Sequence, residues 1–403
     1  MSGVDRLVCP VMPYAWGSRT AIAELCGRAS PSDTPEAELW MGAHPRGAAR
    51  LTRGGVETDL LSVVTAAPEA ALGARVARDF GGRLPFLVKI LAAGEPLSIQ
   101  AHPDMQQAQR GYDDEDARGV PIDAPHRNYK DRSHKPELLC ALGPFEALSG
   151  FRNPRDTLQL LAALDVPALA PVTAALASGD GGLRAAFERV MKTPEADRAA
   201  TVGAVGAACR AHRGRWEREC ARAAELAATY PADMGVVGAL LLNHLTLADG
   251  EAIYLGARSL HAYLSGVGVE IMASSDNVLR GGLTPKHVDV DELLRVVRFE
   301  AERPDVLRGR DVGAQDAREL CWDTPAREFA LSRVDVDGPA RRDTRGPEIL
   351  CCVRGRVTVR GDGDADDLAL APGEVAFVAG STAAYLLGGA GRVFRAQVGA
   401  QSR

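Results

Sequence analysis

Two stretches of the chain repeat one pattern, and this repeat constrains the fold more than any other feature. Residues 249–264 read DGEAIYLGARSLHAYL, and residues 372–387 read PGEVAFVAGSTAAYLL with a one-residue slip. Each contains a turn with Gly-Glu, a short apolar strand, a small-residue turn and a second strand. This cadence is typical of antiparallel jelly-roll barrels, which can hold a metal ion in their mouth. The sequence therefore predicts a mostly β protein that contains two such barrels.

The two copies differ at the position that would bind a metal ion. The first copy has His261, whereas the second has Ala383 or Ala384 at the corresponding place. If both halves are jelly rolls of the cupin type, only the first can provide this ligand. We therefore expect the second barrel to be structural.

A helical segment interrupts the strand pattern near Asn153. Residues 156–164, DTLQLLAAL, have a helical pattern, and Thr193 is a plausible N-cap with Pro194 and Glu195 in the first turn of a later helix. Residues 106–133 are polar and rich in turn residues, which predicts a long loop. We predict four segments along the chain: a first part of the catalytic cupin barrel (1–151), a helical insertion (152–235), the second part of that barrel (236–315) and a C-terminal cupin-like domain without metal ligands (316–403).

The composition is that of a soluble globular protein, with 46% hydrophobic and 25% charged residues among 403. The net charge of -6 offers no general attraction for nucleic acid or an anionic membrane. The N-terminus lacks the pattern of a signal peptide, so none is expected. No window approaches the roughly 20 apolar residues that a membrane-spanning helix needs. The 8 cysteines are scattered without a CxxC pair, which indicates reduced thiols. These features predict a cytoplasmic protein that binds neither nucleic acid nor membranes. They do not determine the oligomeric state, for which we expect a monomer.

Polar side chains alternate at the end of an apolar strand in LSIQAHPDMQQ, residues 97–107. Ser98, Gln100 and His102 would lie on one face, because side chains two apart on a strand project together. With Glu137 and His261 they offer two imidazoles, a carboxylate and an amide oxygen. That set suits a divalent ion such as zinc and leaves an open position for water or substrate. Spacing alone leaves a second interpretation open: a hydrogen-bonded histidine at a polar strand end, with an exposed glutamate.

Several segments together resemble the type I mannose-6-phosphate isomerases, also called phosphomannose isomerases. They run in the family's order from Tyr14 to Lys286: YAWGS, ELWMGAHPRG, LSIQAHPD, HKPE, AIYLGARSLHAYLSG and SSDNVLRGGLTPK. The resemblance implies one zinc ion per chain, held by Gln100, His102, Glu137 and His261. It also implies interconversion of mannose 6-phosphate and fructose 6-phosphate by proton transfer between C1 and C2 through an enediol, which feeds mannose into GDP-mannose synthesis.

The resemblance also points to catalytic residues. Arg280 matches the family's active-site arginine, and its permanent charge suits electrostatic work rather than proton transfer. Glu270 and Asp276 are candidates for the base, and each has an alternative role as a carboxylate that orients Arg280 or Lys135. Lys135 would contact substrate oxygens or else be a solvated lysine at a strand end.

Phosphate binding requires hydrogen-bond donors and positive charge. We expect them from Ser98, Lys89 and Lys286, with Asp276 also on the substrate side. Lys89 lies within an apolar strand, where a lysine is costly to bury without a partner. Two alternatives stay open: a metal-dependent cupin that acts on another small sugar phosphate, and a non-catalytic cupin that binds sugars.

Overall fold

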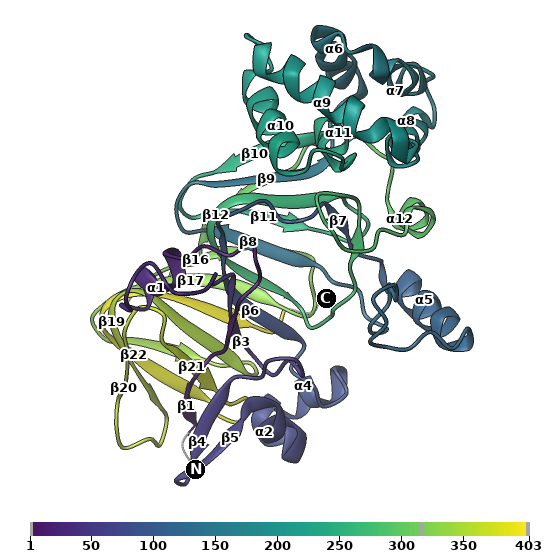
Figure 1. Ribbon diagram of the computed structural model, residues 1–403. Helices are drawn as coiled ribbons and strands as arrows, with labels where there is room; N and C mark the ends of the chain where they lie inside the picture. Colours follow the sequence, from purple (N-terminus) through teal and green to yellow (C-terminus); the bar gives the residue numbers. More distant parts are fainter. Residues whose placement is uncertain (1–2, 314–316, 400–403) are drawn as a thin grey trace.

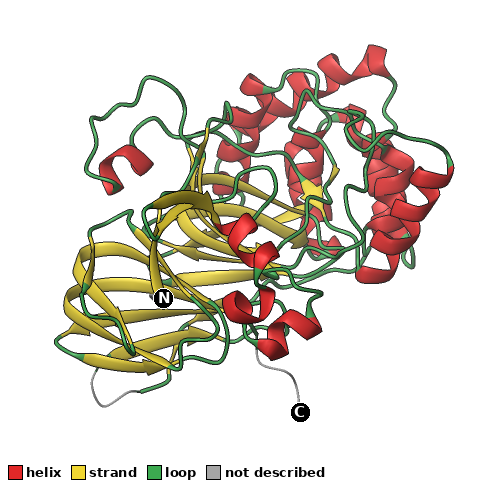
Figure 2. Ribbon diagram, turned by 90° about the horizontal axis from the view of Figure 1, so that it is seen from below, coloured by secondary structure: helices red, strands yellow, loops and turns green. Residues whose placement is uncertain are grey.

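The computed structural model describes residues 3–313 and 317–399. Two large antiparallel sheets lie against each other, and a helical lobe caps the far end of one of them (Figure 1). Seen from below, the helices gather mainly on one side of the molecule and the strands on the other (Figure 2). The sequence prediction of a mostly β protein with a helical insertion agrees with this arrangement. Within the described ranges, no helix is both long enough and apolar enough to cross a membrane.

The first sheet has eleven strands and carries the predicted metal ligands. Its main path is β14 (Val306–Arg308), β11 (Glu251–Leu255), β8 (Glu137–Ala141), β12 (His261–Ala273), β6 (Phe86–Ala93), β3 (Glu38–Met41) and β2 (Val11–Met12). The remaining strands are β7 (Gln100–Ala101), β9 (Phe145–Phe151), β10 (Leu242–Leu247) and β13 (Leu279–Arg280).

Strand β12 connects the two parts of this sheet. From Gly266 onward it pairs with β6, and from Gly268 with β8, whereas its first residues pair with β9 and β7. The change of partner falls at Gly266, where φ is +119° and a Cβ would lie 2.7 Å from the Phe145 ring. Only glycine adopts this conformation readily. Gly266 therefore lets β12 turn from one group of strands to the other.

The alternation of side chains along β6 and β12 separates an outer face from an inner one. Val88 and Ile90 on β6, with Val269 and Ile271 on β12, belong to a buried apolar cluster that includes residues of the second sheet. Because successive side chains point to opposite faces, the residues between them turn into the barrel. The inner face also carries an apolar cluster that includes Leu139.

The second sheet has nine strands and is formed mainly by the C-terminal part of the chain. The N-terminal strand β1 joins it, since Val4 pairs with Val378. The sequence analysis expects residues 1–151 in the first part of the catalytic barrel, whereas this pairing places β1 in the second sheet. The path is β1 (Val4–Leu7), β21 (Val375–Val378), β19 (Glu348–Gly361), β22 (Ala384–Gln397), β17 (Ala330–Asp337), β16 (Arg318–Trp322) and β15 (Arg310–Asp311), with β18 (Ala340–Asp343) and β20 (Leu368–Leu370) beside it.

The helical lobe forms between β9 and β10. Helix α8, for example, buries an apolar face formed by Leu183, Phe187 and Val190. Helix α9 begins at Glu195 with Pro194 as its N-cap, one residue later than expected from Thr193. The lobe comprises α6 (Pro154–Leu164), η1 (Pro167–Leu169), α7 (Ala170–Leu176), α8 (Gly182–Met191), α9 (Glu195–Ala211), α10 (Glu217–Thr229) and α11 (Gly235–Leu240).

The prediction of a long loop over residues 106–133 is wrong for its first half. Helix α5 (Met105–Ala117) occupies that stretch and stands apart from the sheets (Figure 1). A capping box starts it: the Asp104 side chain accepts from the Gln107 backbone, and the Gln107 side chain accepts from the Asp104 backbone. The capping box satisfies two backbone N–H groups at the start of the helix, and this favours a helix despite the polar composition of the segment.

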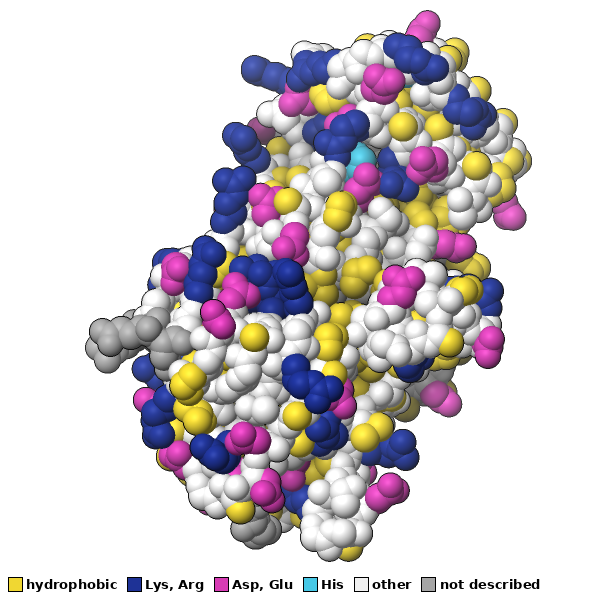
Figure 3. Space-filling model, turned by 90° about the vertical axis from the view of Figure 1, so that its left-hand side faces the viewer, with side chains coloured by type: hydrophobic (Ala, Val, Ile, Leu, Met, Phe, Trp, Pro, Cys, Tyr) yellow, Lys and Arg dark blue, Asp and Glu magenta, His cyan; other side chains and the backbone are white. Residues whose placement is uncertain are grey.

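Shorter elements complete the chain: α1 (Ala21–Leu25), β4 (Arg50–Arg53), β5 (Val56–Asp59), α2 (Leu60–Ala66), α3 (Pro68–Leu72), α4 (Ala74–Asp79) and α12 (Val290–Val296). On the face shown in Figure 3, basic and acidic side chains are interspersed over the sheets and the helical lobe.

Candidate metal centre and active site

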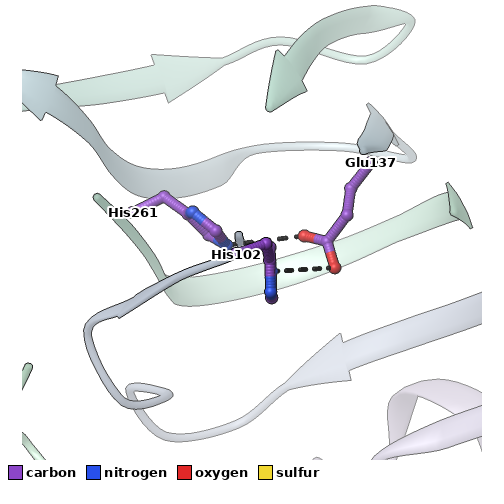
Figure 4. A group of neighbouring side chains, drawn as sticks. All are labelled: His102, Glu137 and His261. Atoms are coloured by element: carbon purple, nitrogen blue, oxygen red, sulfur yellow. Dashed lines mark ion pairs between the residues drawn. The ribbon is translucent and has the colours of Figure 1, made fainter. Parts of the chain in front are cut away.

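Three predicted ligands meet at one point inside the first barrel (Figure 4). The Nε2 atom of His102 lies 3.3 Å from Glu137 Oε1, and Nε2 of His261 lies 3.4 Å from Glu137 Oε2. All three side chains are buried, and their ligand atoms lie within 4.8 Å of one another. Within residues 3–313 and 317–399, this is the one group of three His, Cys, Asp or Glu side chains with such spacing.

The curvature of β12 makes this meeting possible. Glu137 pairs in register with Met272 near the end of β12, yet its side chain contacts His261 at the beginning of the strand. Eleven residues of straight strand would span roughly 36 Å, too far for one glutamate to bridge. Because β12 bends at Gly266, its two ends approach the same carboxylate.

Hydrogen bonds fix both imidazoles with their Nε2 atoms free to bind. Nδ1 of His102 lies 2.7 Å from the Asn277 carbonyl oxygen, and Nδ1 of His261 lies 3.1 Å from that of Ser259. A carbonyl oxygen can only accept, so each Nδ1 carries the hydrogen and each Nε2 presents a lone pair. This arrangement is the usual one for histidines that ligate metals.

The same atoms lack other partners. Among the described residues, both Nε2 atoms and Glu137 Oε2 are buried without a hydrogen-bond partner. Three unsatisfied acceptors around one point would be costly in an empty pocket, and they fit a divalent cation.

The protonation states favour metal binding as well. Burial lowers the pKa of His102 to about 4, which keeps the imidazole neutral. Burial opposes ionisation of Glu137, but the neighbouring Lys135 and His102 hold the pKa of that carboxyl well below its usual range. The centre therefore offers a neutral His102 imidazole and an ionised Glu137 carboxylate.

Two further predicted residues lie beside the three ligands. Gln100, the expected fourth ligand, pairs in register with His261 on one side and with Arg280 on the other. Lys135 is buried, and its Nζ lies 3.1 Å from Glu137 Oε1. Strand pairing thus gathers the residues that the sequence places in three distant segments.

Lys89, expected to bind phosphate, lies inside the barrel between two carboxylates. Its Nζ is 2.9 Å from Glu270 Oε2 and 3.2 Å from Glu38 Oε1, and all three side chains are buried. Burial disfavours the ammonium form, but these carboxylates outweigh it and raise the pKa of Lys89. Burial raises the pKa of Glu270, although Lys89 opposes that shift. Glu38, which the sequence did not single out, also accepts from Trp40 Nε1 at 2.7 Å.

Arg280 is a half-buried cation without a carboxylate partner in the described part of the chain. Burial lowers its pKa. Lys286 is exposed, and burial together with Arg280 and Arg46 lowers its pKa, which places these cations near one another. Arg46 is paired with Asp276, but Arg280 and Lys286 have no carboxylate partner among the described residues, so the group keeps a net positive charge that favours an anion.

Ser98 and Asp276 flank this region. Ser98 is partly buried, in the segment whose next residue, Ile99, exchanges backbone hydrogen bonds with Gly281 and Gly282. Asp276 lies 3.3 Å from Arg46 Nη1 and 3.4 Å from His44 Nε2, so neither Arg280 nor Lys135 is its ion-pair partner.

Sequence reasoning gave no role to Asn277 and Asp131. Asn277 is fully buried, and its side chain contacts residues 130–133. The available signal was a Ser-Ser-Asp-Asn run before a short strand, since such residues commonly bind nearby backbone groups.

Comparison with known proteins agrees with this geometry. The family model for the phosphomannose isomerase type I catalytic domain matches residues 4–154. The mannose-6-phosphate isomerases of Salmonella typhimurium and Escherichia coli are each 38% identical to the chain, over 97% of it and 99% of their own length. The human enzyme is 33% identical over 83% of the chain and 82% of its own length.

Solved structures give the same result. The Salmonella typhimurium mannose 6-phosphate isomerase bound to its substrate, fructose 6-phosphate, and to zinc superposes with a TM-score of 0.90 at 37% identity. The match covers 99% of this chain and 100% of that one. A zinc-bound mannose 6-phosphate isomerase gives the same values. The cupin fold expected from the repeat is therefore confirmed, and the chain belongs to the type I mannose-6-phosphate isomerases.

Proposed function

We propose that the chain interconverts mannose 6-phosphate and fructose 6-phosphate with one zinc ion held by Gln100, His102, Glu137 and His261. The observation that carries the proposal is the set of three buried, unsatisfied ligand atoms within 4.8 Å, in a chain that follows characterised isomerases along almost its whole length. A bound zinc ion supplies Lewis-acid polarisation of substrate oxygens.

The reaction moves two protons within the open-chain sugar. The proton on C2 of the aldose transfers to C1, and the hydroxyl proton on O2 transfers to O1, through an enediol. Negative charge develops on oxygen during the transfer, so fixed cations lower the barrier. Arg280, which has no carboxylate partner among the described residues, and Lys135, beside Glu137, are the two cations that we assign to this task.

Glu270 is our candidate for the proton-transferring group. Burial raises the pKa of its carboxyl, and a raised pKa suits a group that accepts a proton and returns it. Lys89 fixes that carboxylate at 2.9 Å, so Lys89 acts on Glu270 in this scheme rather than on the phosphate. Asp276 is engaged with Arg46 and His44 and is the weaker candidate.

The phosphate group is assigned to Lys286, Ser98 and the outer side of Arg280. Lys286 lies on the exposed side of the cation cluster, where a dianionic group can approach from solvent. The proposal also includes a monomeric state, a cytoplasmic location and a C-terminal barrel without metal ligands. Size-exclusion chromatography tests the oligomeric state.

The relatives make another sugar phosphate or a non-catalytic sugar-binding role the less favoured alternatives, because curated isomerases match the chain from end to end. The deciding experiment replaces His261 by alanine and measures bound zinc and turnover of mannose 6-phosphate. We expect both to fall together while circular dichroism stays unchanged. Full turnover in that variant would remove His261 from the site and end the proposal.

A further inference from the structure

The buried side chain of Asn277 forms the centre of a clamp between two segments of the site. Asn277 lies between β12 and β13, and it is fully buried despite its polar amide. Its Oδ1 accepts from the backbone N–H groups of Lys130 at 2.7 Å and Asp131 at 3.2 Å. Its Nδ2 donates to the carbonyl oxygens of Asp131 and Ser133, both at 2.8 Å. The amide thus makes close to its full complement of hydrogen bonds with one short segment.

Asp131 completes the clamp from the other side. Its carboxylate accepts from the backbone N–H groups of Ser133 at 2.9 Å and Asp276 at 2.8 Å. It also accepts from the Ser275 hydroxyl at 2.9 Å. Residues 130–133 and 275–277 are therefore joined by hydrogen bonds in both directions.

The clamp reaches the metal centre along two routes. The main-chain carbonyl of Asn277 accepts from Nδ1 of His102 at 2.7 Å, which sets the orientation of that imidazole. The segment held by its side chain ends at Ser133, two residues before Lys135 and four before Glu137. A shift of Asn277 would therefore move two ligands relative to each other.

Arg280 follows Asn277 by three residues and starts from the same anchored stretch. The backbone of β13 is held to β7, where Arg280 pairs with Gln100. The clamp thus also relates the main cation of the site to its ligands.

We propose that Asn277 and Asp131 are positioning residues, which hold His102, the Lys135–Glu137 segment and Arg280 in the relative geometry that metal binding and turnover require. This inference rests on the proposed function for its kinetic part only. Mutation of a residue that hydrogen-bonds to a metal ligand typically lowers metal affinity or activity about 10- to 100-fold.

The test replaces Asn277 by aspartate, which keeps the size of the side chain. In Asn277→Asp a carboxylate oxygen replaces the Nδ2 donor, opposite the carbonyl oxygens of Asp131 and Ser133 and the Asp131 carboxylate. The new carboxylate oxygen then faces three acceptor oxygens, and the hydrogen bonds from residue 277 to Asp131 and Ser133 are lost. Asp131→Asn disrupts the other half of the clamp, because an amide N–H then faces one of the backbone N–H groups of Ser133 and Asp276 that donate to the Asp131 carboxylate.

The matched control is Glu348→Gln in the second sheet. Glu348 is equally buried and accepts from Tyr385, Arg395 and Gln397, so its replacement also disrupts a buried hydrogen-bond network. It lies outside the site, and we expect it to lower the melting temperature without changing metal binding or kcat.

Three readouts separate positioning from general stability: zinc affinity by chelator competition, the visible absorption spectrum of Co²⁺ bound in place of zinc, and kcat and KM for mannose 6-phosphate. We expect Asn277→Asp and Asp131→Asn to weaken zinc binding about 10- to 100-fold and to alter the cobalt spectrum. At saturating zinc, kcat should fall more than KM rises.

A clamp variant that loses melting temperature as Glu348→Gln does, but keeps the wild-type zinc affinity and cobalt spectrum, would overturn the inference. If Asn277→Asp does not fold, Asp131→Asn carries the same test. A wild-type protein that binds cobalt but does not turn over mannose 6-phosphate would refute the proposed function, while the cobalt spectra would still decide on the clamp.

Discussion

Replacing Lys89 by methionine removes the positive charge that lies between two buried carboxylates. In the native protein Lys89 Nζ lies 2.9 Å from Glu270 Oε2 and 3.2 Å from Glu38 Oε1. The three side chains are no more than 7% exposed. Methionine fills a similar volume, so the change tests charge rather than packing.

The expected loss follows from this burial. Removing one partner from a buried ion pair typically costs about 3–5 kcal/mol, because the remaining charge is left without compensation. Glu38 keeps one hydrogen bond from Trp40, whereas Glu270 loses the ammonium group that lies 2.9 Å from its Oε2. We therefore expect most of the loss to arise at Glu270, which can reduce it by taking up a proton.

The loss should depend on pH with a definite sign. Burial already raises the pKa of Glu270 in the native protein, and removal of Lys89 raises it further. The folded variant then binds a proton that the unfolded chain has released, so its stability falls as pH rises above the ordinary glutamate pKa. One such group changes the free energy of unfolding by about 1.4 kcal/mol per pH unit, or about 2.7 kcal/mol between pH 5.5 and 7.5.

Urea unfolding of zinc-loaded wild type and Lys89→Met at both pH values measures this difference. The double variant Lys89→Met/Glu270→Gln serves as the control, and it should recover part of the stability and most of the pH independence. A loss below about 1 kcal/mol at pH 7.5, or a loss that grows as pH falls, would contradict the assignment of Lys89 as the charge partner of Glu270.

Three further predictions follow from single contacts. Arg280→Ala should keep its zinc and lose turnover at least about 100-fold, since it removes charge stabilisation without touching a ligand; unchanged kinetics would place Arg280 outside the reaction. Gly111→Ala should lower the melting temperature, because a Cβ would lie 2.2 Å from the Tyr129 ring; a neutral result would show that α5 can shift. Asp104→Ala removes the N-cap of α5 and should lower the free energy of unfolding by about 1 kcal/mol. Unchanged stability would show that the capping box does not stabilise α5.

The proposed metal ligands can be predicted from the sequence because each lies in a short segment with its own pattern. His102 and Gln100 alternate at a strand end, and the His261 segment repeats as a recognisable turn and strand in the second sheet. Three of the four meet in the structure, and Gln100 adjoins them by pairing with His261 on β12. The family resemblance supplied what spacing lacked, namely that distant segments converge.

The partners of charged residues were harder to foresee. The sequence predicts phosphate binding by Lys89 because a lysine within an apolar strand needs an anion, and in the structure Glu270 on the adjacent strand is such an anion. The register between β6 and β12 determines which charged side chains lie opposite each other, and that register depends on where β12 bends. For α5, the polar composition suggested a loop, although the Asp104–Gln107 capping box was present in the sequence.

The second sheet repeats the strand pattern around a buried carboxylate that already has hydrogen-bond donors. At the place of His261 it has Ala384, the first residue of β22. Its buried Glu348 accepts from Arg395 Nε and Nη2 at 2.6 and 2.7 Å and from the Tyr385 hydroxyl at 2.8 Å. In the first barrel, Glu137 Oε2 and the two imidazole Nε2 atoms keep their lone pairs unsatisfied. Buried acceptors that already have donors stabilise the fold on their own, whereas acceptors without donors need a cation, and this difference is the reason that we propose the metal site in the first barrel.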